Sequence, residues 1–222
     1  MSGDLHGWQR GDRVGDEFIV QRKLGQGVEA VVYLVRDRRD GQLRTLKLFR
    51  RTNMMAEVEH TFRHWQQYAG LDCMKQCLEW GVLRGQRRVS ERPWMLMEYI
   101  PGVTLAEQIE RGHIRDPTML AIRLLEAMVP LHTRGIGLGD LDRGRNVVIV
   151  RGTGKLGRIV FIDADAGTPG YAPPEIYEDL LEVLWLAREC ARSKLPADLT
   201  KVLTEAPDAA AALQQLEAGV GY

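Results

Sequence analysis

The chain has 222 residues, of which 45% are hydrophobic and 27% charged, the balance of an ordinary globular protein. Its 30 basic residues equal its 30 acidic residues, so net charge gives no support for a nucleic-acid or membrane surface. No stretch approaches the ~18 apolar residues of a membrane helix, and the polar N-terminus lacks the apolar run of a signal peptide. We therefore expect a cytoplasmic protein with neither nucleic-acid nor membrane partners.

Cysteine and histidine give little sign of a metal site. The three cysteines are too few for a disulfide framework, and Cys73 and Cys77 lie four apart with no matching pair nearby, so we expect reduced, buried thiols. The five histidines do not cluster at the spacing of metal ligands, apart from His60 and His64, which lack a third ligand. We expect them to be surface residues.

The first part of the chain is rich in strand patterns. Three apolar runs follow one another over residues 17–49, separated by turn residues at 25–27 and 40–41, and predict an antiparallel meander. Two further strands are expected at 78–83 and 94–100. Between them, apolar residues at spacings of three and four predict an amphipathic helix: Met55, Val58, Phe62 and Trp65.

The pattern changes at Pro101-Gly102, which we interpret as a hinge. Beyond it the sequence predicts helices, interrupted by two short strands at 146–150 and 158–162. The helices are expected at residues 104–111, 117–132, 176–192, and 198 to about 216. The chain is therefore predicted to be an α+β protein with an N-terminal extension (residues 1–16), a strand-rich lobe (17–100) and an abbreviated helical lobe (101–222).

Two features of the strand-rich lobe are typical of phosphate binding. Gly25 and Gly27 lie between two strands, where glycine lets a backbone pass close to phosphate groups, and Val32 could cover an aromatic base. Lys47 lies on an apolar strand, where removing its charge from water is costly unless an anionic partner is present. That partner would be phosphate together with Glu59 or Glu57 of the next helix, and Glu59 is preferred. The alternatives are a glycine-rich turn without a ligand and an outward-facing lysine.

The helical lobe carries a second set of chemically suited residues. Asp140 follows the end of a predicted helix, Asn146 comes a few residues later, and Asp163 ends a buried strand. A carboxylate can accept a hydroxyl proton, while a carboxamide and a second carboxylate offer oxygen ligands to Mg²⁺. The segment Gly167 to Glu175 has a composition too specific for an arbitrary loop. Asp, Gly and Asn are also ordinary loop residues, so none of these residues alone indicates a function. The order and spacing of the motifs along the chain are what favour a functional interpretation.

In that order and spacing, the chain resembles the eukaryotic-type Ser/Thr protein kinases over roughly residues 17–192, a part of the protein-kinase-like superfamily. The glycine-rich run, Lys47 and the Leu-His-x-x-Gly-Ile lead-in to Asp140 match the family's motifs, as does the Gly-Thr-Pro-Gly-Tyr segment from Gly167. Its small size also resembles the atypical kinases of the RIO type. The resemblance implies a bilobal fold that binds ATP and Mg²⁺ between an N-lobe, with an antiparallel sheet and one helix, and a truncated helical C-lobe.

The resemblance also implies roles for single residues. Asp140 would be the catalytic aspartate, Lys47 and Glu59 the ion pair that clamps the phosphates, and Asn146 and Asp163 the magnesium ligands. The residues expected to bind the nucleotide share a place in the N-lobe or the hinge: Gly25, Gly27, Val32, Lys47, Met97 as gatekeeper, and the main-chain groups of Glu98 and Ile100.

The chain departs from the family in its loops. Leu138-Gly139 replaces the usual His-Arg, which removes the arginine that reads activation-loop phosphorylation. Asn146 lies six residues after Asp140 where the family has five, so a bulged loop is expected and Asp142 could compete as base. Asp163-Ala164-Asp165 replaces Asp-Phe-Gly, and Asp165 could share the metal or be solvated. With only eleven residues between Asp163 and Glu175, an activation-loop switch is not expected.

The leading hypothesis is therefore an ATP-dependent phosphotransferase that phosphorylates Ser or Thr of a protein, without an activation-loop switch. A pseudokinase that serves as a nucleotide-binding interaction module is the first alternative, motivated by Ala164 and the shifted Asn146. A small-molecule kinase on the same fold is the second, and the Gly167 to Glu175 segment argues against it.

Overall fold

The computed structural model describes residues 7–83, 91–150, 157–164, 175–191 and 194–219. The predicted loop at 85–88, the turn at 152–154, Asp165 and residues 167–174 lie outside these ranges. The chain divides into two compact units, residues 1–70 with 75–99 and residues 71–74 with 100–222, and each is described by itself. In the described ranges, no helix is long and apolar enough to cross a membrane.

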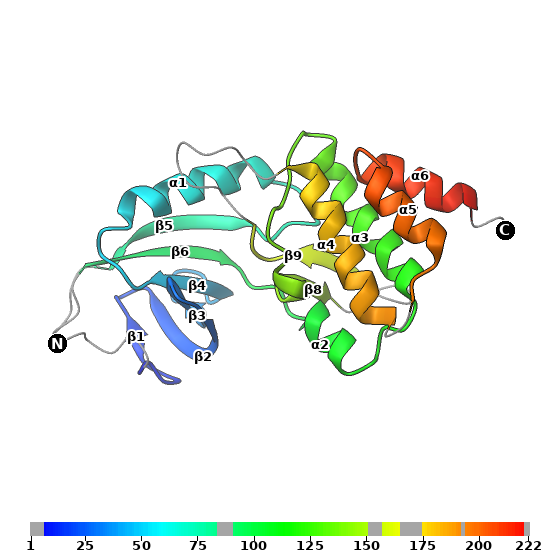
Figure 1. The fold of residues 1–222 in the computed structure, drawn as a ribbon. Coiled ribbons are helices and arrows are strands. Elements are labelled where there is room, and N and C mark those ends of the chain that lie inside the picture. The colour runs from blue at the N-terminus through cyan, green and yellow to red at the C-terminus, as the bar shows by residue number, and fades with distance from the viewer. Residues whose placement is uncertain (1–6, 84–90, 151–156, 165–174, 192–193, 220–222) are drawn as a thin grey trace. The chain divides into compact units, whose positions relative to one another are not determined.

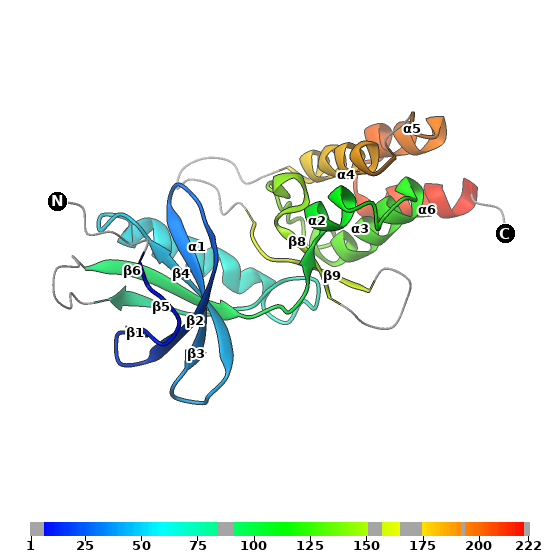
Figure 2. The ribbon, with the colours of Figure 1, turned by 90° about the horizontal axis from the view of Figure 1, so that it is seen from below.

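The first unit is built on a six-stranded antiparallel sheet (Figure 1). Its strands follow the spatial order β1 (Arg13–Val14), β2 (Phe18–Gln26), β3 (Ala30–Asp37), β4 (Leu43–Phe49), β6 (Arg92–Glu98) and β5 (Cys77–Leu83). Neighbouring strands in this order are antiparallel, so the predicted meander is confirmed. The sheet is strongly curled (Figure 2), and a Cβ on Gly15, after β1, would lie 3.5 Å from Cδ1 of Leu83 on β5.

The two faces of this sheet bury different side chains. Successive residues of a strand point to opposite faces, and on β6 Trp94 and Leu96 belong to one apolar core while the buried Met95 and Met97 alternate with them. That core contains residues of strands β1, β2, β3, β4 and β6: Val14, Phe18, Val20, Val31, Tyr33, Val35, Leu46, Leu48, Trp94 and Leu96.

A helix, α1 (Met55–Trp65), packs along β5 and β6 (Figure 1) and continues into the short helix η1 (Gln66–Tyr68). Its buried residues Val58 and Trp65 lie on the apolar stripe that the sequence showed, so the predicted amphipathic helix is confirmed.

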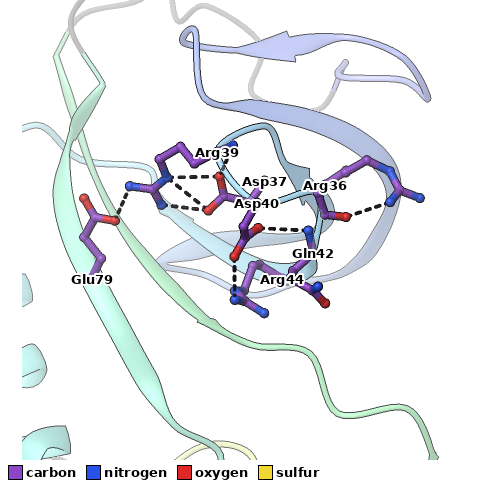
Figure 3. Close-up of polar contacts among 8 residues, drawn as sticks. Arg36, Asp37, Arg39, Asp40, Gln42, Arg44 and Glu79 are labelled. Carbon is purple, nitrogen blue, oxygen red and sulfur yellow. Dashed lines mark hydrogen bonds and ion pairs between the residues drawn. The ribbon is translucent and has the colours of Figure 1, made fainter.

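The turn between β3 and β4 is held by charged side chains (Figure 3). Asp37 is buried and accepts hydrogen bonds from Arg39, which lower the pKa of its carboxyl group. Arg39 also reaches Glu79 on β5 at 2.8 Å, although β3 and β5 are not neighbours in the sheet. Asp40 accepts from the backbone N–H of Gln42 at 2.9 Å. The ion pairs thus connect the turn to a distant strand of the curled sheet.

The second unit combines a small sheet with helices (Figure 1). The sheet has the order β7 (Val103–Thr104), β8 (Val147–Val150) and β9 (Arg158–Phe161), and the short helix η2 (Asp142–Gly144) precedes β8. The helices are α2 (Leu105–Glu110), α3 (Pro117–His132), α4 (Ile176–Ala191), α5 (Ala197–Glu205) and α6 (Ala209–Gly219). α3 packs against both α4 and α6.

Local chemistry accounts for the ends of these elements. α3 begins where Asp116 accepts the N–H groups of Thr118 and Met119, with Pro117 at the first helical position, where the N–H that proline lacks is not needed. Gly102, before β7, must be glycine because a Cβ would lie 2.4 Å from Cγ1 of Val148.

One helix prediction needs correction. The helical stretch predicted from 198 to about 216 is two helices, α5 and α6. Pro207 lies at the break, where it lacks the N–H that a continuous helix would use. Asp208 then starts α6 by accepting the N–H of Ala211 at 2.8 Å. The rest of the α+β prediction, a curled antiparallel sheet with one helix followed by a helical unit, is confirmed.

Candidate functional site

In the first unit, the strand register gathers the predicted nucleotide-binding residues on one face of the sheet. Gly25 of β2 lies opposite Val32 of β3, Val32 lies opposite Lys47 of β4, and Lys47 lies opposite Met95 of β6. Residues directly opposite each other in a sheet share a face. Met97, two residues beyond Met95, is on this face as well. It is the face away from the core that contains Tyr33 and Trp94.

The glycines at the tip of this row are not explained by folding. Neither Gly25 nor Gly27 has a positive φ, and a Cβ added at either position would meet nothing within 4 Å. The turn closes through a hydrogen bond from Gly27 N–H to the carbonyl of Ala30 at 2.9 Å, which any residue could make. The side chain of Val28 at the tip is 90% exposed. Because glycine has no side chain, the space beside the backbone at Gly25 and Gly27 is open. A phosphate group needs such open space to approach the backbone closely.

Lys47 is half-buried on β4, and its Nζ lies 5.8 Å from the centroid of the Phe49 ring. Glu59 on α1 is also half-buried, and its carboxylate accepts a hydrogen bond from Arg63 one turn later at 2.6 Å. Glu57 lies in the exposed first turn of the helix. The pairing of Lys47 with Glu59 rather than Glu57 stays a prediction, and the contact with Arg63 uses only one of the two oxygens of Glu59.

The predicted adenine-contacting residues end β6 and follow it. Met97 is 3% exposed. The N–H of Glu98 donates to the carbonyl of Gln76 at 2.9 Å, so any contact between Glu98 and a base would use the carbonyl oxygen of Glu98. Ile100 is half-buried at the start of the second unit.

In the second unit, Asp140 and Asn146 are in contact. The amide Nδ2 of Asn146 donates to the main-chain carbonyl of Asp140 at 3.1 Å and to its carboxylate at 3.3 Å. Because the nitrogen faces Asp140, the oxygen of the same carboxamide points elsewhere and can serve as a ligand. The six-residue spacing therefore does not separate the two side chains.

The extra residue of this loop is accommodated by left-handed backbone. Asp142 (φ 41°) and Arg143 (φ 52°) are the non-glycine residues with positive φ in the described part of the chain, and Gly144 follows at φ 83°. Such a conformation costs about 1 kcal/mol per non-glycine residue. The guanidinium of Arg143 compensates in part by lying 5.3 Å from the ring centroid of Trp185.

Asp163 lies beside this loop because the N–H of Ile162 donates to the carbonyl of Asn146 at 2.8 Å. Asp163 is half-buried and accepts from the N–H of Ala164 at 3.2 Å, and Ala164 is buried. In the described ranges, no three His, Cys, Asp or Glu side chains come together as a metal cluster. The assignment of Asn146 and Asp163 as magnesium ligands stays a prediction, and Asp165 lies outside the described residues.

A buried carboxylate fixes the segment that leads into Asp140. Asp179 on α4 is 0% exposed and accepts the N–H groups of Leu138 at 2.8 Å and Gly139 at 2.9 Å. It also accepts from Nε2 of His132 at 3.1 Å. The expectation that the histidines lie on the surface is wrong for His132, whose side chain is only 1% exposed. Its burial depends on α3, α4 and α6 meeting, which no local pattern in the sequence reports.

Glu182 is a residue that sequence reasoning missed. It lies almost one turn after Asp179 on α4, and its Oε2 is buried without a hydrogen-bond partner. Burial raises the pKa of its carboxyl group, and the carboxylates of Asp140 and Asp179 raise it further, while Arg143 lowers it. The spacing of Glu182, three residues after Asp179 on a predicted helix, could have drawn attention to it. The residues that surround its carboxyl group in the folded protein could not be predicted from the sequence.

A pocket of about 650 Å³ lies elsewhere in the second unit, between the end of α4 and α5. It is lined in part by Arg188, Lys201 and Glu205. None of the predicted site residues lines it, so it does not bear on the phosphate chemistry.

Comparisons with known proteins give a fold match and no sequence match. No protein-family model matches the chain, and no curated protein matches it with significance. Among solved structures, 1990 chains match. One is a doubly substituted form of the PknI kinase domain of Mycobacterium tuberculosis, with a TM-score of 0.64 and 19% identity over 96% of this chain and 97% of that chain. The unsubstituted PknI kinase domain gives a TM-score of 0.62 and 18% identity over 96% and 98%. The chain has the protein-kinase-like fold.

Proposed function

We propose that the protein is an ATP-dependent phosphotransferase that transfers the γ-phosphoryl group of ATP to a Ser or Thr hydroxyl of a protein. The observation that carries the proposal is the contact of Asn146 with Asp140, next to Asp163, in a chain with the protein-kinase-like fold. The exposed carboxylate of Asp140 thus contacts the amide nitrogen of Asn146, whose oxygen would serve Mg²⁺ together with the carboxylate of Asp163.

The face of the first unit that carries Gly25, Val32 and Lys47 supports nucleotide binding. Val32 and Met97 offer apolar contact to a base, and the open backbone at Gly25 and Gly27 would lie against the phosphates. Lys47 would bind phosphate oxygens with Glu59 as its partner. The carbonyl of Glu98 and the main chain of Ile100 would meet the polar edge of adenine.

In phosphoryl transfer the protein mainly positions the reactants and neutralises charge. Asp140 would accept the proton of the attacking hydroxyl, and Asn146 holds Asp140 by donating to its carboxylate. Asp179 fixes the main chain just before Asp140 through two N–H groups. Mg-ATP, when bound, supplies the phosphoryl group and the metal charge, with Asn146 and Asp163 as the protein ligands. Asp142, with its carboxylate also exposed, is the competing base.

The direct test is incubation of the purified protein with Mg-ATP and general protein substrates, followed by phosphosite mapping by mass spectrometry. We expect phosphoserine or phosphothreonine on substrate or on the chain itself, reduced at least about a hundredfold by Asp140→Asn and by Asp163→Asn. The exposed Asp72→Asn should retain the wild-type rate as a matched control, and Asp142→Asn separates the two candidate bases. No transfer by the wild-type protein, with Asp140→Asn indistinguishable from it, would refute the proposal.

A nucleotide-binding module without turnover is the second candidate. The observation in its favour is Ala164, which is buried directly after Asp163 where the kinases have a large phenylalanine. The two candidates differ in their response to ATP. Thermal stabilisation by Mg-ATP with no labelled protein product would favour the module. Consumption of ATP only when a metabolite extract is added would favour a small-molecule kinase instead.

A further inference from the structure

A buried arginine lies at one end of the sheet, on the face that does not carry Lys47. Arg92 begins β6, two residues before Trp94, so its side chain shares the face that holds Trp94 and Leu96 in the apolar core. It is 8% exposed. Its Nε and Nη1 are buried and have no hydrogen-bond partner. In the part of the chain that the structure describes, no acidic side chain forms an ion pair with it, and the adjacent Glu91 is exposed.

A second arginine lies across from it. Leu48 of β4 pairs with Trp94 of β6, and the same antiparallel register continued by two residues places Arg50 opposite Arg92. Burial lowers the pKa of Arg92, and the nearby charge of Arg50 lowers it further. Nε of Arg50 donates to the carbonyl of Gly27 at 3.2 Å. The positive charge of Arg50 therefore lies near the buried guanidinium of Arg92, at the end of an apolar core.

This arrangement is unfavourable for the protein alone. Like charges directly opposite each other in a sheet repel, and a buried guanidinium with unmet donors loses its hydration without replacement. An arginine remains charged even in such surroundings, so deprotonation does not remove the energetic cost of its buried charge. An oxyanion between the two groups would satisfy the donors and cancel the repulsion. Two neighbouring cations favour a dianion, and a phosphate monoester carries about −1.5 to −2 charges at neutral pH.

We propose that Arg92 and Arg50 form a binding site for a phosphate group, on the face of the sheet opposite the one that carries Lys47. Arg92 belongs to the face of the sheet opposite the proposed nucleotide site. Arg50 also touches the glycine-rich turn, through the carbonyl of Gly27, but the proposal does not depend on nucleotide binding there. The phosphate is either a free anion or a phosphorylated side chain of a partner polypeptide, since the same chemistry recognises both.

The test measures binding of inorganic phosphate to the full chain by calorimetry and thermal shift, at constant ionic strength set with chloride. We expect saturable binding and a rise in apparent melting temperature that chloride does not produce. Arg92→Met and Arg50→Met should each weaken phosphate binding by roughly tenfold or more. Arg36→Met, which removes an exposed arginine from the same sheet, should leave it within about twofold of wild type.

Two further arms make the outcome decisive. Lys47→Met should retain the phosphate response, which separates this site from the nucleotide face. A phosphoserine peptide that competes with phosphate, while its unphosphorylated form does not, would identify a partner side chain as the source, and phosphate binding without such competition would identify the free anion. The proposal is overturned if phosphate acts no differently from chloride, or if the response survives both Arg92→Met and Arg50→Met. If Arg92→Met fails to fold, Arg50→Met alone decides.

Discussion

Nε2 of His132 lies 3.1 Å from Oδ2 of Asp179, and both side chains are almost completely excluded from solvent. The N–H of Ala209 donates to the other ring nitrogen of His132 at 3.0 Å. Because a backbone N–H can only donate, Nδ1 is the acceptor and Nε2 carries the proton that is shared with Asp179. One imidazole thus joins α3, α4 and the start of α6, and it orients the carboxylate that holds the loop before Asp140.

Asp179→Asn should destabilise the protein by about 3 kcal/mol or more, because one oxygen of the carboxylate becomes a donor. That donor would face either the N–H of Gly139 or the N–H of Leu138 together with Nε2 of His132. Chemical denaturation measures the change in the free energy of unfolding. Glu178→Gln, an exposed neighbour on the same helix, is the control and should change stability little. A loss below about 1 kcal/mol in Asp179→Asn would contradict the role assigned to this carboxylate.

Glu182→Gln should make the protein more stable at neutral pH. The pKa of Glu182 is raised in the folded state, by burial first and then by Asp140 and Asp179, so the folded protein favours the neutral acid. The ionised form therefore opposes folding, and stability is lost as the pH rises from the ordinary glutamate pKa through the raised one. Denaturation at pH near 4 and near 7 should show a gain for Glu182→Gln only at the higher pH. Equal stabilities at both values would argue against the assignment.

Gly27→Ala should leave folding intact and weaken nucleotide binding. An added Cβ meets nothing within 4 Å, so we expect a stability change within about 0.5 kcal/mol. The same Cβ would occupy space that a phosphate needs, and the thermal shift caused by Mg-ATP should shrink. Gly81→Ala is the contrasting variant, because its Cβ would lie 2.6 Å from Cζ2 of Trp94 and should destabilise the fold. A Gly27→Ala protein that binds ATP as well as wild type does would remove the glycine-rich turn from the nucleotide site.

The native cysteines should react slowly with thiol reagents at pH 8. Burial raises the pKa of Cys77 to about 12, with the charges of Lys75 and Lys47 opposing the shift, and burial also raises the pKa of Cys73. Both are therefore protonated at that pH, and a thiol is a poor nucleophile compared with its thiolate. A colourimetric thiol assay should show rapid reaction of all three cysteines only after denaturation. Fast labelling of Cys77 in the folded protein would show that it is not protected.

Much of the fold followed from local patterns. The spacing of Val58 and Trp65 marked the buried face of α1, and the turn residues at 25–27 and 40–41 separated the strands of the meander. These predictions succeed because period and turn chemistry depend on residues a few positions apart. The prediction of one long C-terminal helix was wrong at Pro207. A proline inside a helical pattern is itself a local sign that the helix ends there.

Local patterns were enough to predict the order of the elements and the chemically suited candidates: Gly25, Gly27, Lys47, Asp140, Asn146 and Asp163. Which of these residues share a face of the sheet or touch each other depends on the folded chain. The row from Gly25 to Met95 depends on the register of four strands, and the contact of Asn146 with Asp140 depends on left-handed backbone at Asp142 and Arg143.

The burial of His132 against Asp179, the raised pKa of Glu182 and the proximity of Arg50 to Arg92 likewise arise between residues far apart in the chain. Burial and electrostatic partners are properties of the packed molecule. A sequence pattern can identify a titratable residue, but the pKa of that residue and its charge partners are set by the neighbours that folding brings to it.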